Sequence, residues 1–181
     1  MTRVSRHLAL AFGLFAGSLP EASDAQAGAA KLICEITENA EAASGTVSVQ
    51  RDGKEIAGGT CGKELSLPPG SYSAVVKLDG ALDGPSQTKS LSVEAGSKSV
   101  LKVDFATGTL EIRIASQGKR AAGMAIIKKN GVQIGTLGSG VAAHLSAGSY
   151  QVTARYRTQE KDLGTVAVSA GQRVSLDAAF E

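Results

Sequence analysis

Aromatic residues and histidine are scarce in this chain. Only 4% of its 181 residues are aromatic, none is tryptophan, and two are histidines. Sugar-binding platforms and haem pockets depend on packed or stacked rings, so the composition disfavours both. Two histidines also leave little from which to build a metal centre or a histidine-based catalytic site. The sequence therefore predicts no cofactor and no metal, and it favours a protein that is not an enzyme.

Hydrophobic runs of membrane-spanning length are also lacking. The apolar run Leu8–Leu19 has twelve residues, whereas a spanning helix needs about 20. Arg3 and Arg6 precede the run, and Ala25-Gln26-Ala27 follows it as a cleavage pattern of the A-x-A type. We therefore predict a signal peptide over residues 1–27, no membrane span, and export to a periplasm or to the extracellular space. A buried N-terminal helix is the alternative interpretation.

The strongest positive signal is an internal repeat. A shift of 78 residues aligns the 41-residue block Leu32–Tyr72 with Leu110–Tyr150 without a gap. Beyond it the shift falls to 75, because the loop around Asp79–Ser86 is longer in the first copy. Two copies of one module explain this pattern. The predicted division is a first repeat over 28–106 and a second over 107–181.

Each copy alternates apolar and polar residues with the period of two that is typical of strands. The pattern predicts an all-β chain of two tandem immunoglobulin-like (prealbumin-like) β-sandwiches, each with about seven short antiparallel strands. In the first copy we expect strands near residues 32–37, 46–51, 54–58, 63–67, 71–78, 89–94 and 99–105. The last strand of one copy and the first of the next are separated only by Ala106-Thr107-Gly108, so the two modules should have few possible relative orientations.

Two equivalent turns test the expected register. Asp52-Gly53 and Asn130-Gly131 are the residue types that a two-residue type I′ hairpin requires, since both positions need a positive φ. Such turns would place Val49 opposite Ile56, and Ile127 opposite Ile134.

Turn and core motifs of the repeat also resemble a known group of modules. Gly118–Gly123 reads as a G-K-x-x-A-G bend, Leu67–Tyr72 as an L-P-P-G-S-Y turn, and Val93–Gly96 as a V-x-A-G turn. Together they are similar to the carboxypeptidase-regulatory-like group of prealbumin-like (transthyretin-like) sandwiches, and in part to PEGA-type surface repeats. The resemblance implies an accessory, adhesive or spacer domain and carries over no catalytic residue.

The two cysteines both lie in the first copy. Cys34 and Cys61 have the parity of inward-facing residues, and their counterparts in the second copy are Ile112 and Ser139. An exported chain with two cysteines favours a disulfide between them. Two separate buried thiols are the alternative.

Charge is distributed unequally between the copies. Residues 28–106 carry 8 basic and 10 acidic side chains, whereas residues 107–181 carry 9 basic and 5 acidic ones. Four basic residues of the second copy form a candidate patch for an anionic partner: Lys128, Lys129, Arg155 and Arg157. An ordinary solvated strand face is the alternative. Nucleic acid is not expected as a partner, because the patch lacks interleaved aromatic residues for base stacking.

Other residues with chemical potential stand alone. His144 has no second histidine or cysteine pair to share a metal with. Gly138-Ser139-Gly140 lacks the nucleophile elbow of a serine hydrolase. Asp79 and Asp83 offer two carboxylates for calcium, without further oxygen ligands in pattern. The sequence thus predicts an exported interaction or structural module whose partner is an extracytoplasmic protein or an envelope polymer. A binder of anionic glycan or cell-envelope polymer through the basic second repeat is the alternative.

Overall fold

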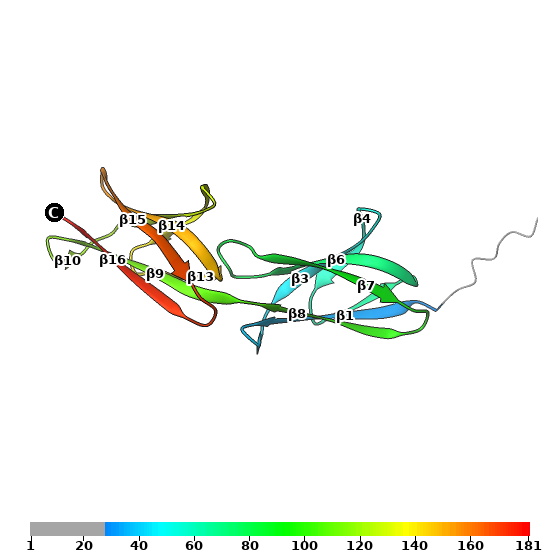
Figure 1. Ribbon diagram of the computed structural model, residues 1–181. Helices are drawn as coiled ribbons and strands as arrows, with labels where there is room; N and C mark the ends of the chain where they lie inside the picture. Colours follow the sequence, from blue (N-terminus) through cyan, green and yellow to red (C-terminus); the bar gives the residue numbers. More distant parts are fainter. Residues whose placement is uncertain (1–27) are drawn as a thin grey trace, which may run out of the picture.

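Alternating apolar and polar residues form strands along the whole described chain. The computed structural model describes residues 28–181, and the regular secondary structure in that range consists of β-strands (Figure 1). The all-β prediction is confirmed. The predicted signal peptide, residues 1–27, lies outside the described residues. Within residues 28–181, no helix has the length and hydropathy of a membrane span.

Eight strands form the first sandwich, and all seven predicted strands are among them. One sheet has the order β4-β3-β6-β7, and the other pairs β1 with β2, β5 and β8. The strands are β1 (Ala30–Glu38), β2 (Glu41–Ala42), β3 (Gly45–Arg51), β4 (Lys54–Thr60), β5 (Glu64–Leu67), β6 (Gly70–Leu78), β7 (Ser86–Val93) and β8 (Lys98–Phe105).

The second sandwich repeats this arrangement strand for strand. Its sheets have the order β12-β11-β14-β15, and β9 paired with β10, β13 and β16. The strands are β9 (Thr107–Ser116), β10 (Lys119–Arg120), β11 (Met124–Lys129), β12 (Val132–Gly138), β13 (Ala142–Ser146), β14 (Gly148–Tyr156), β15 (Gln159–Val168) and β16 (Arg173–Phe180).

The expectation of purely antiparallel pairing was wrong. Strand β8 pairs with β1 in parallel, and β16 pairs with β9 in parallel. In each sandwich the chain crosses from one sheet to the other before its last strand, and that strand returns beside the first one in the same direction. Parallel strands need such a crossover because a tight hairpin joins only antiparallel neighbours.

The two hairpin turns have the predicted conformation, but the register beyond them differs. φ is 52° at Asp52 and 76° at Gly53. A β-bulge between Val49 and Gln50 then pairs Val49 with Ala57 instead of Ile56, and the equivalent bulge pairs Ile127 with Gly135 instead of Ile134. A bulge places two residues opposite one and strengthens the local twist. Ile56 is consequently 43% exposed.

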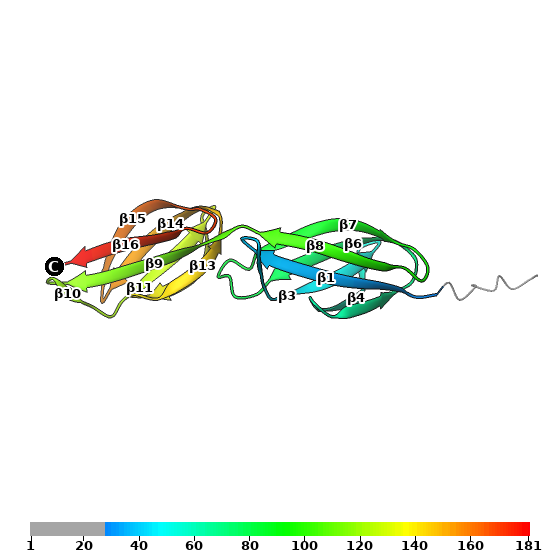
Figure 2. The same ribbon diagram turned by 90° about the horizontal axis from the view of Figure 1, so that it is seen from below.

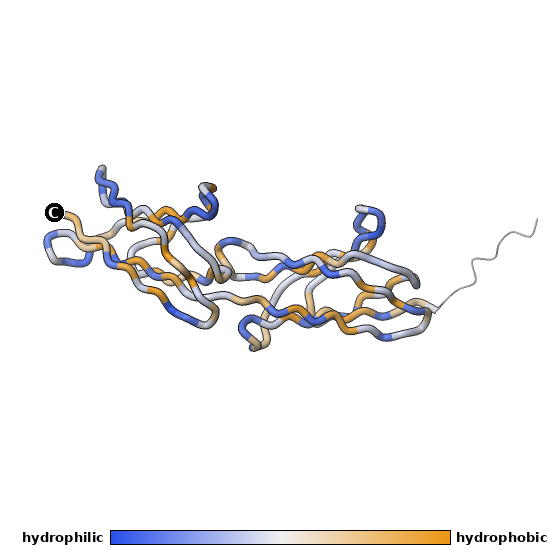
Figure 3. Tube along the Cα trace, in the orientation of Figure 1, coloured by the Kyte–Doolittle hydropathy of each residue, from blue (hydrophilic) through white to orange (hydrophobic). Residues whose placement is uncertain are grey.

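Each sandwich encloses its own core of inward-facing strand residues. Hydrophobic and hydrophilic positions alternate along the strands, and the most hydrophilic stretches include several hairpin tips (Figure 3). Tyr72, Ala74, Val76 and Leu78 on β6 are all buried, as the period of two predicted. In the first sandwich Cys34 and Cys61 form a disulfide that joins β1 to the turn after β4. At the equivalent place in the second sandwich, the Ser139 hydroxyl accepts a hydrogen bond from the backbone N–H of Ile114 at 2.9 Å.

Gly45 and its repeat equivalent Gly123 are fixed by packing. A Cβ at Gly123 would lie 2.6 Å from the Arg155 carbonyl oxygen and 2.9 Å from the Ile114 side chain, and one at Gly45 would overlap the equivalent groups of the first sandwich. We expect Gly45→Ala to lower the free energy of unfolding by about 3 kcal/mol, the upper range for overpacking. Urea unfolding followed by circular dichroism measures this. Gly138→Ala is the matched control, because a Cβ there would come no closer than 3.4 Å to a neighbouring atom. Equal stability of the two variants would contradict the account.

The two sandwiches lie end to end and form an elongated molecule (Figure 2). The described chain begins at one end, beside β1, and the C-terminus lies at the other (Figure 1). Strand β8 ends at Phe105 and β9 begins at Thr107. A single residue therefore separates the last strand of the first sandwich from the first strand of the second.

Candidate functional site

The long loop of the first sandwich reaches the second sandwich at the junction. This loop, residues 79–85 between β6 and β7, is called the clamp loop below. The Leu82 backbone N–H donates to the His144 carbonyl oxygen at 2.8 Å, and Ala81 forms a parallel β-bridge with His144. The clamp loop therefore extends the sheet of the second sandwich at the outer edge of β13.

Leu82 contributes an apolar contact to the same junction. Its side chain packs against the core of the second sandwich although it belongs to the first. Gly135 on β12 makes room for it, because a Cβ there would lie 2.6 Å from Leu82 Cδ1. The equivalent residue of the first sandwich is Ala57. The insertion in one copy and the glycine in the other are thus complementary.

Asp83 forms the polar centre of the junction. Its side chain is only 3% exposed. One carboxylate oxygen accepts from the Ser146 backbone N–H at 3.0 Å, and the other accepts from Lys129 Nζ at 2.8 Å and from the Tyr150 hydroxyl at 3.0 Å. A buried carboxylate is stable only when such donors replace its water. In the sequence, Asp83 was a candidate ligand for calcium. In the structure, hydrogen-bond donors and the Lys129 ammonium group surround its carboxylate.

These donors determine the protonation of the group. Burial alone would raise the pKa of Asp83, but the hydrogen bonds from Lys129, Ser146 and Tyr150 outweigh it and hold the pKa below its ordinary value. The Asp83 carboxylate in turn raises the pKa of Lys129. The junction is therefore ionised and intact at neutral pH.

Acid should open this contact. Because the Asp83 pKa is depressed in the folded protein, its stabilisation is present above the ordinary aspartate pKa of about 3.9 and is lost as the pH falls through the lower, folded-state value. We expect the Ser146 amide proton shift, followed by NMR, to titrate with a midpoint below about 3.9. Asp83→Asn should abolish that titration. A midpoint above the ordinary value would contradict the assignment.

A second set of contacts holds the linker between the sandwiches. The Asn39 side-chain amide donates to the Thr107 carbonyl oxygen at 2.9 Å and accepts from the Thr107 N–H at 3.1 Å, so it pairs with the linker as a strand would. The Thr107 hydroxyl donates to the Glu38 carboxylate, and that carboxylate lies 3.0 Å from His144 Nδ1. The His144 side chain is 56% exposed, as expected of a surface residue, and His144 contributes to the junction through both its ring and its backbone.

The four residues of the predicted basic patch have different neighbours. Lys129 pairs with Asp83 at the junction. Arg155 pairs with Glu160, and the Arg157 guanidinium lies 5.1 Å from the centre of the Tyr156 ring. Lys128 lies on β11, opposite Gln151. Two of the four cations therefore already have carboxylate partners within the chain, and a shared anionic partner stays a prediction.

The second sandwich also carries an ionic cluster that the sequence did not reveal. Glu111 on β9 is almost buried and accepts from Arg173 at 2.6 Å and from Arg113 at 3.1 Å. Hydrogen bonds from Arg173 and then Arg113 lower the pKa of Glu111 to about 2. A general acid at neutral pH needs a raised pKa instead. The cluster therefore acts as an ion pair on the sheet surface.

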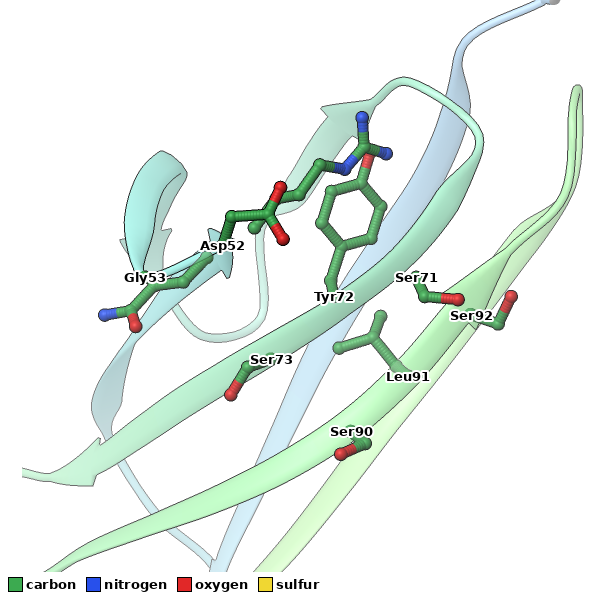
Figure 4. A pocket seen from close by; sticks show the side chains of 10 residues that line it. Asp52, Gly53, Ser71, Tyr72, Ser73, Ser90, Leu91 and Ser92 are labelled. Atoms are coloured by element: carbon green, nitrogen blue, oxygen red, sulfur yellow. The ribbon is translucent and has the colours of Figure 1, made fainter.

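At the end of the first sandwich that points away from the junction, the Arg51 guanidinium packs over the Tyr72 ring. Arg51 Nη2 donates to the Tyr72 hydroxyl at 2.6 Å and to the Pro69 carbonyl oxygen at 3.0 Å, and the guanidinium lies 4.4 Å from the ring centre. A groove of about 510 Å³ adjoins this pair. Its wall carries serines of β6 and β7 and Leu91 beside the Tyr72 ring (Figure 4).

Sequence reasoning found most of these residues without finding the junction. It singled out the longer loop, Asp83, His144 and Lys129, but assigned them to separate roles. The missing signal was the coincidence of the insertion in the first copy with Gly135 in the second. Within residues 28–181, no three His, Cys, Asp or Glu side chains are grouped so that they could hold a metal ion.

Comparisons with known proteins report remote likenesses only. No family model and no curated protein matches the chain. Among solved structures, the Bacillus anthracis TIE protein is 14% identical with a TM-score of 0.42; the match covers 85% of this chain and 34% of that one. The minor pilin GBS52 of Streptococcus agalactiae is 12% identical with a TM-score of 0.40, and the match covers 84% and 94% of the two chains. The shaft pilin SpaA of Lactobacillus rhamnosus GG, a double mutant, is 10% identical with a TM-score of 0.30, covering 85% and 98%. This chain thus spans about a third of the length of the TIE protein, and likenesses at these scores carry no argument about function.

Proposed function

We propose that this protein is an exported, non-enzymatic structural or interaction module of accessory, adhesive or spacer type. Residues 28–106 and 107–181 act as two repeats that the clamp loop and the linker contacts hold in one orientation. The observation that carries the proposal is Asp83, a buried carboxylate of the first sandwich satisfied by three donors of the second. Such a junction gives the chain a fixed length and presents its two ends to partners.

The disulfide supports the proposed location. Structural disulfides persist in oxidising compartments, whereas cytosolic thiols are kept reduced. The bond between Cys34 and Cys61 lies in a sandwich small enough to need such a covalent link. Cleavage of residues 1–27 belongs to the same proposal.

The finer family assignment is also part of this proposal. The motifs that resemble carboxypeptidase-regulatory-like modules occupy turns: Leu67–Tyr72 joins β5 to β6, and Val93–Gly96 leaves β7 toward β8. Their positions support a shared module type in both repeats.

Fractionation of the native cells combined with cross-linking tests the proposed function. A membrane-impermeant amine-reactive reagent should link the protein to one or a few extracytoplasmic proteins, and the recovered chain should begin near Gly28. Recovery of the chain from Met1 in the cytosolic fraction would contradict export. A processed chain recovered without any cross-linked neighbour would contradict the interaction role.

A further inference from the structure

The repeat places a counterpart of the junction at the outer end of the first sandwich, and none of residues 28–181 forms a clamp loop there. At the junction, the clamp loop contacts β13, Lys129 and Tyr150. The same shift of 78 residues places β5, Arg51 and Tyr72 at the equivalent positions. Among the described strands, β5 pairs with β1 alone, so its other edge has no strand partner. The equivalent edge of β13 pairs with the clamp loop.

We propose that this outer end of the first sandwich docks an acidic loop of a separate protein. This inference rests on the proposed interaction role and names the chemistry of the partner. The loop would extend the sheet at Ser66 of β5, as Leu82 does at His144, and would place a carboxylate on the Arg51 guanidinium. The Tyr72 hydroxyl beside it donates its proton to the Pro68 carbonyl oxygen at 2.5 Å. The Arg51 hydrogen bonds found within the described residues both come from Nη2. The N–H groups of Nε and Nη1 are therefore available for a carboxylate.

The differences between the two ends define the partner further. Ser146, whose N–H binds Asp83, is replaced by Pro68, which has no N–H, so the arginine must supply that donor. At the junction, Leu82 packs against Gly135. The equivalent residue at the outer end is Ala57, whose methyl group leaves less space for a side chain of the partner. The partner loop is therefore expected to carry a residue smaller than leucine before its acidic residue.

A second copy of this chain does not provide that loop. Its own clamp loop is engaged at its own junction. At the far end of the second sandwich, β14 and β15 are joined only by Arg157 and Thr158, and the nearby Glu160 already pairs with Arg155. Within residues 28–181 that end thus presents no unpaired acidic loop to a second copy, and the inference takes a separate protein as the occupant.

Peptide binding to the chain from Gly28 to Glu181 tests this inference. The probe is a capped peptide with the sequence Gly80–Pro85 but with alanine in place of Leu82, and binding is followed by NMR of the isotopically labelled protein. We expect amide shifts at Ser66 and Tyr72, and a weakening by about tenfold when the peptide aspartate becomes asparagine or when Arg51 becomes alanine. Arg157→Ala removes an arginine from another tyrosine ring and is the matched control, with unchanged binding.

Each outcome decides the matter. Shifts at the Tyr72 end that disappear in Arg51→Ala and persist in Arg157→Ala support the docking site. No shift at that end at millimolar peptide, equal binding of the asparagine peptide, or shifts confined to Tyr150 at the junction would overturn it. Failure of this test leaves the cell cross-linking result untouched, so the two proposals fail separately.

Discussion

Replacing Leu82 by serine and Asp83 by asparagine is expected to uncouple the second sandwich from the first. The half-buried leucine contributes about 2 kcal/mol through its contact with the second core. The carboxylate contributes about 2 kcal/mol more through hydrogen bonds to a charged group. Because the second sandwich has no disulfide, it should unfold first in the double variant, so that urea unfolding separates into two transitions.

The control for this experiment lies in the same loop. Asp79 contributes a backbone N–H to Ser44 within the first sandwich. Its substitution by asparagine should therefore leave the unfolding curve unchanged. A double variant that unfolds in one transition at the wild-type urea concentration would show that the clamp loop does not couple the two sandwiches.

Removal of the disulfide should have an effect of similar size on the first sandwich. The bond joins residues separated by 27 positions, for which the loss of loop-closure entropy in the unfolded chain is worth about 3.5 kcal/mol. We expect Cys34→Ala with Cys61→Ala to lower the free energy of unfolding by that amount in urea, without changing the second sandwich.

The second sandwich supplies a better replacement for the same bond. Its residues are Ile112 and Ser139, and the serine hydroxyl accepts from the Ile114 backbone N–H. Cys34→Ile with Cys61→Ser should therefore lose less stability than the double alanine variant, because the isoleucine fills the core and the serine satisfies the equivalent N–H of Ile36. Equal losses of stability in both variants would mean that the isoleucine and serine of the second sandwich cannot replace the disulfide of the first.

The sequence predicted the strands well because most strands bury one face, whereas the short strands β2 and β10 are exposed throughout. The alternation that placed Tyr72, Ala74 and Val76 inside is a property of neighbouring residues, and so are the turns at Asp52-Gly53 and Asn130-Gly131. Parallel pairing of β1 with β8 was missed because it depends on the sheet to which a distant strand returns. The bulge beside Val49 was missed because the alternative register also places apolar residues opposite one another.

The junction could be predicted only in parts. Alignment of the repeats showed that the clamp loop was longer than its counterpart, but the unequal charge of the two copies was interpreted as a patch for an external anionic partner. The contact of Asp83 with Lys129 and Tyr150 requires the two sandwiches to be placed end to end, and nothing local in the sequence specifies that placement. Glu111 was missed for a related reason: its partner Arg173 lies on the last strand, which joins β9 only in the folded sheet.

The distance between the sandwiches in solution tests the fixed junction most directly. Nitroxide labels at Lys89 on β7 and Ser175 on β16 report it by pulsed electron resonance, since both residues are exposed and lie outside the junction. The account predicts one narrow distance distribution at neutral pH, which broadens in the Leu82→Ser, Asp83→Asn double variant. A broad distribution in the wild-type protein, or an equally narrow one in the double variant, would contradict it.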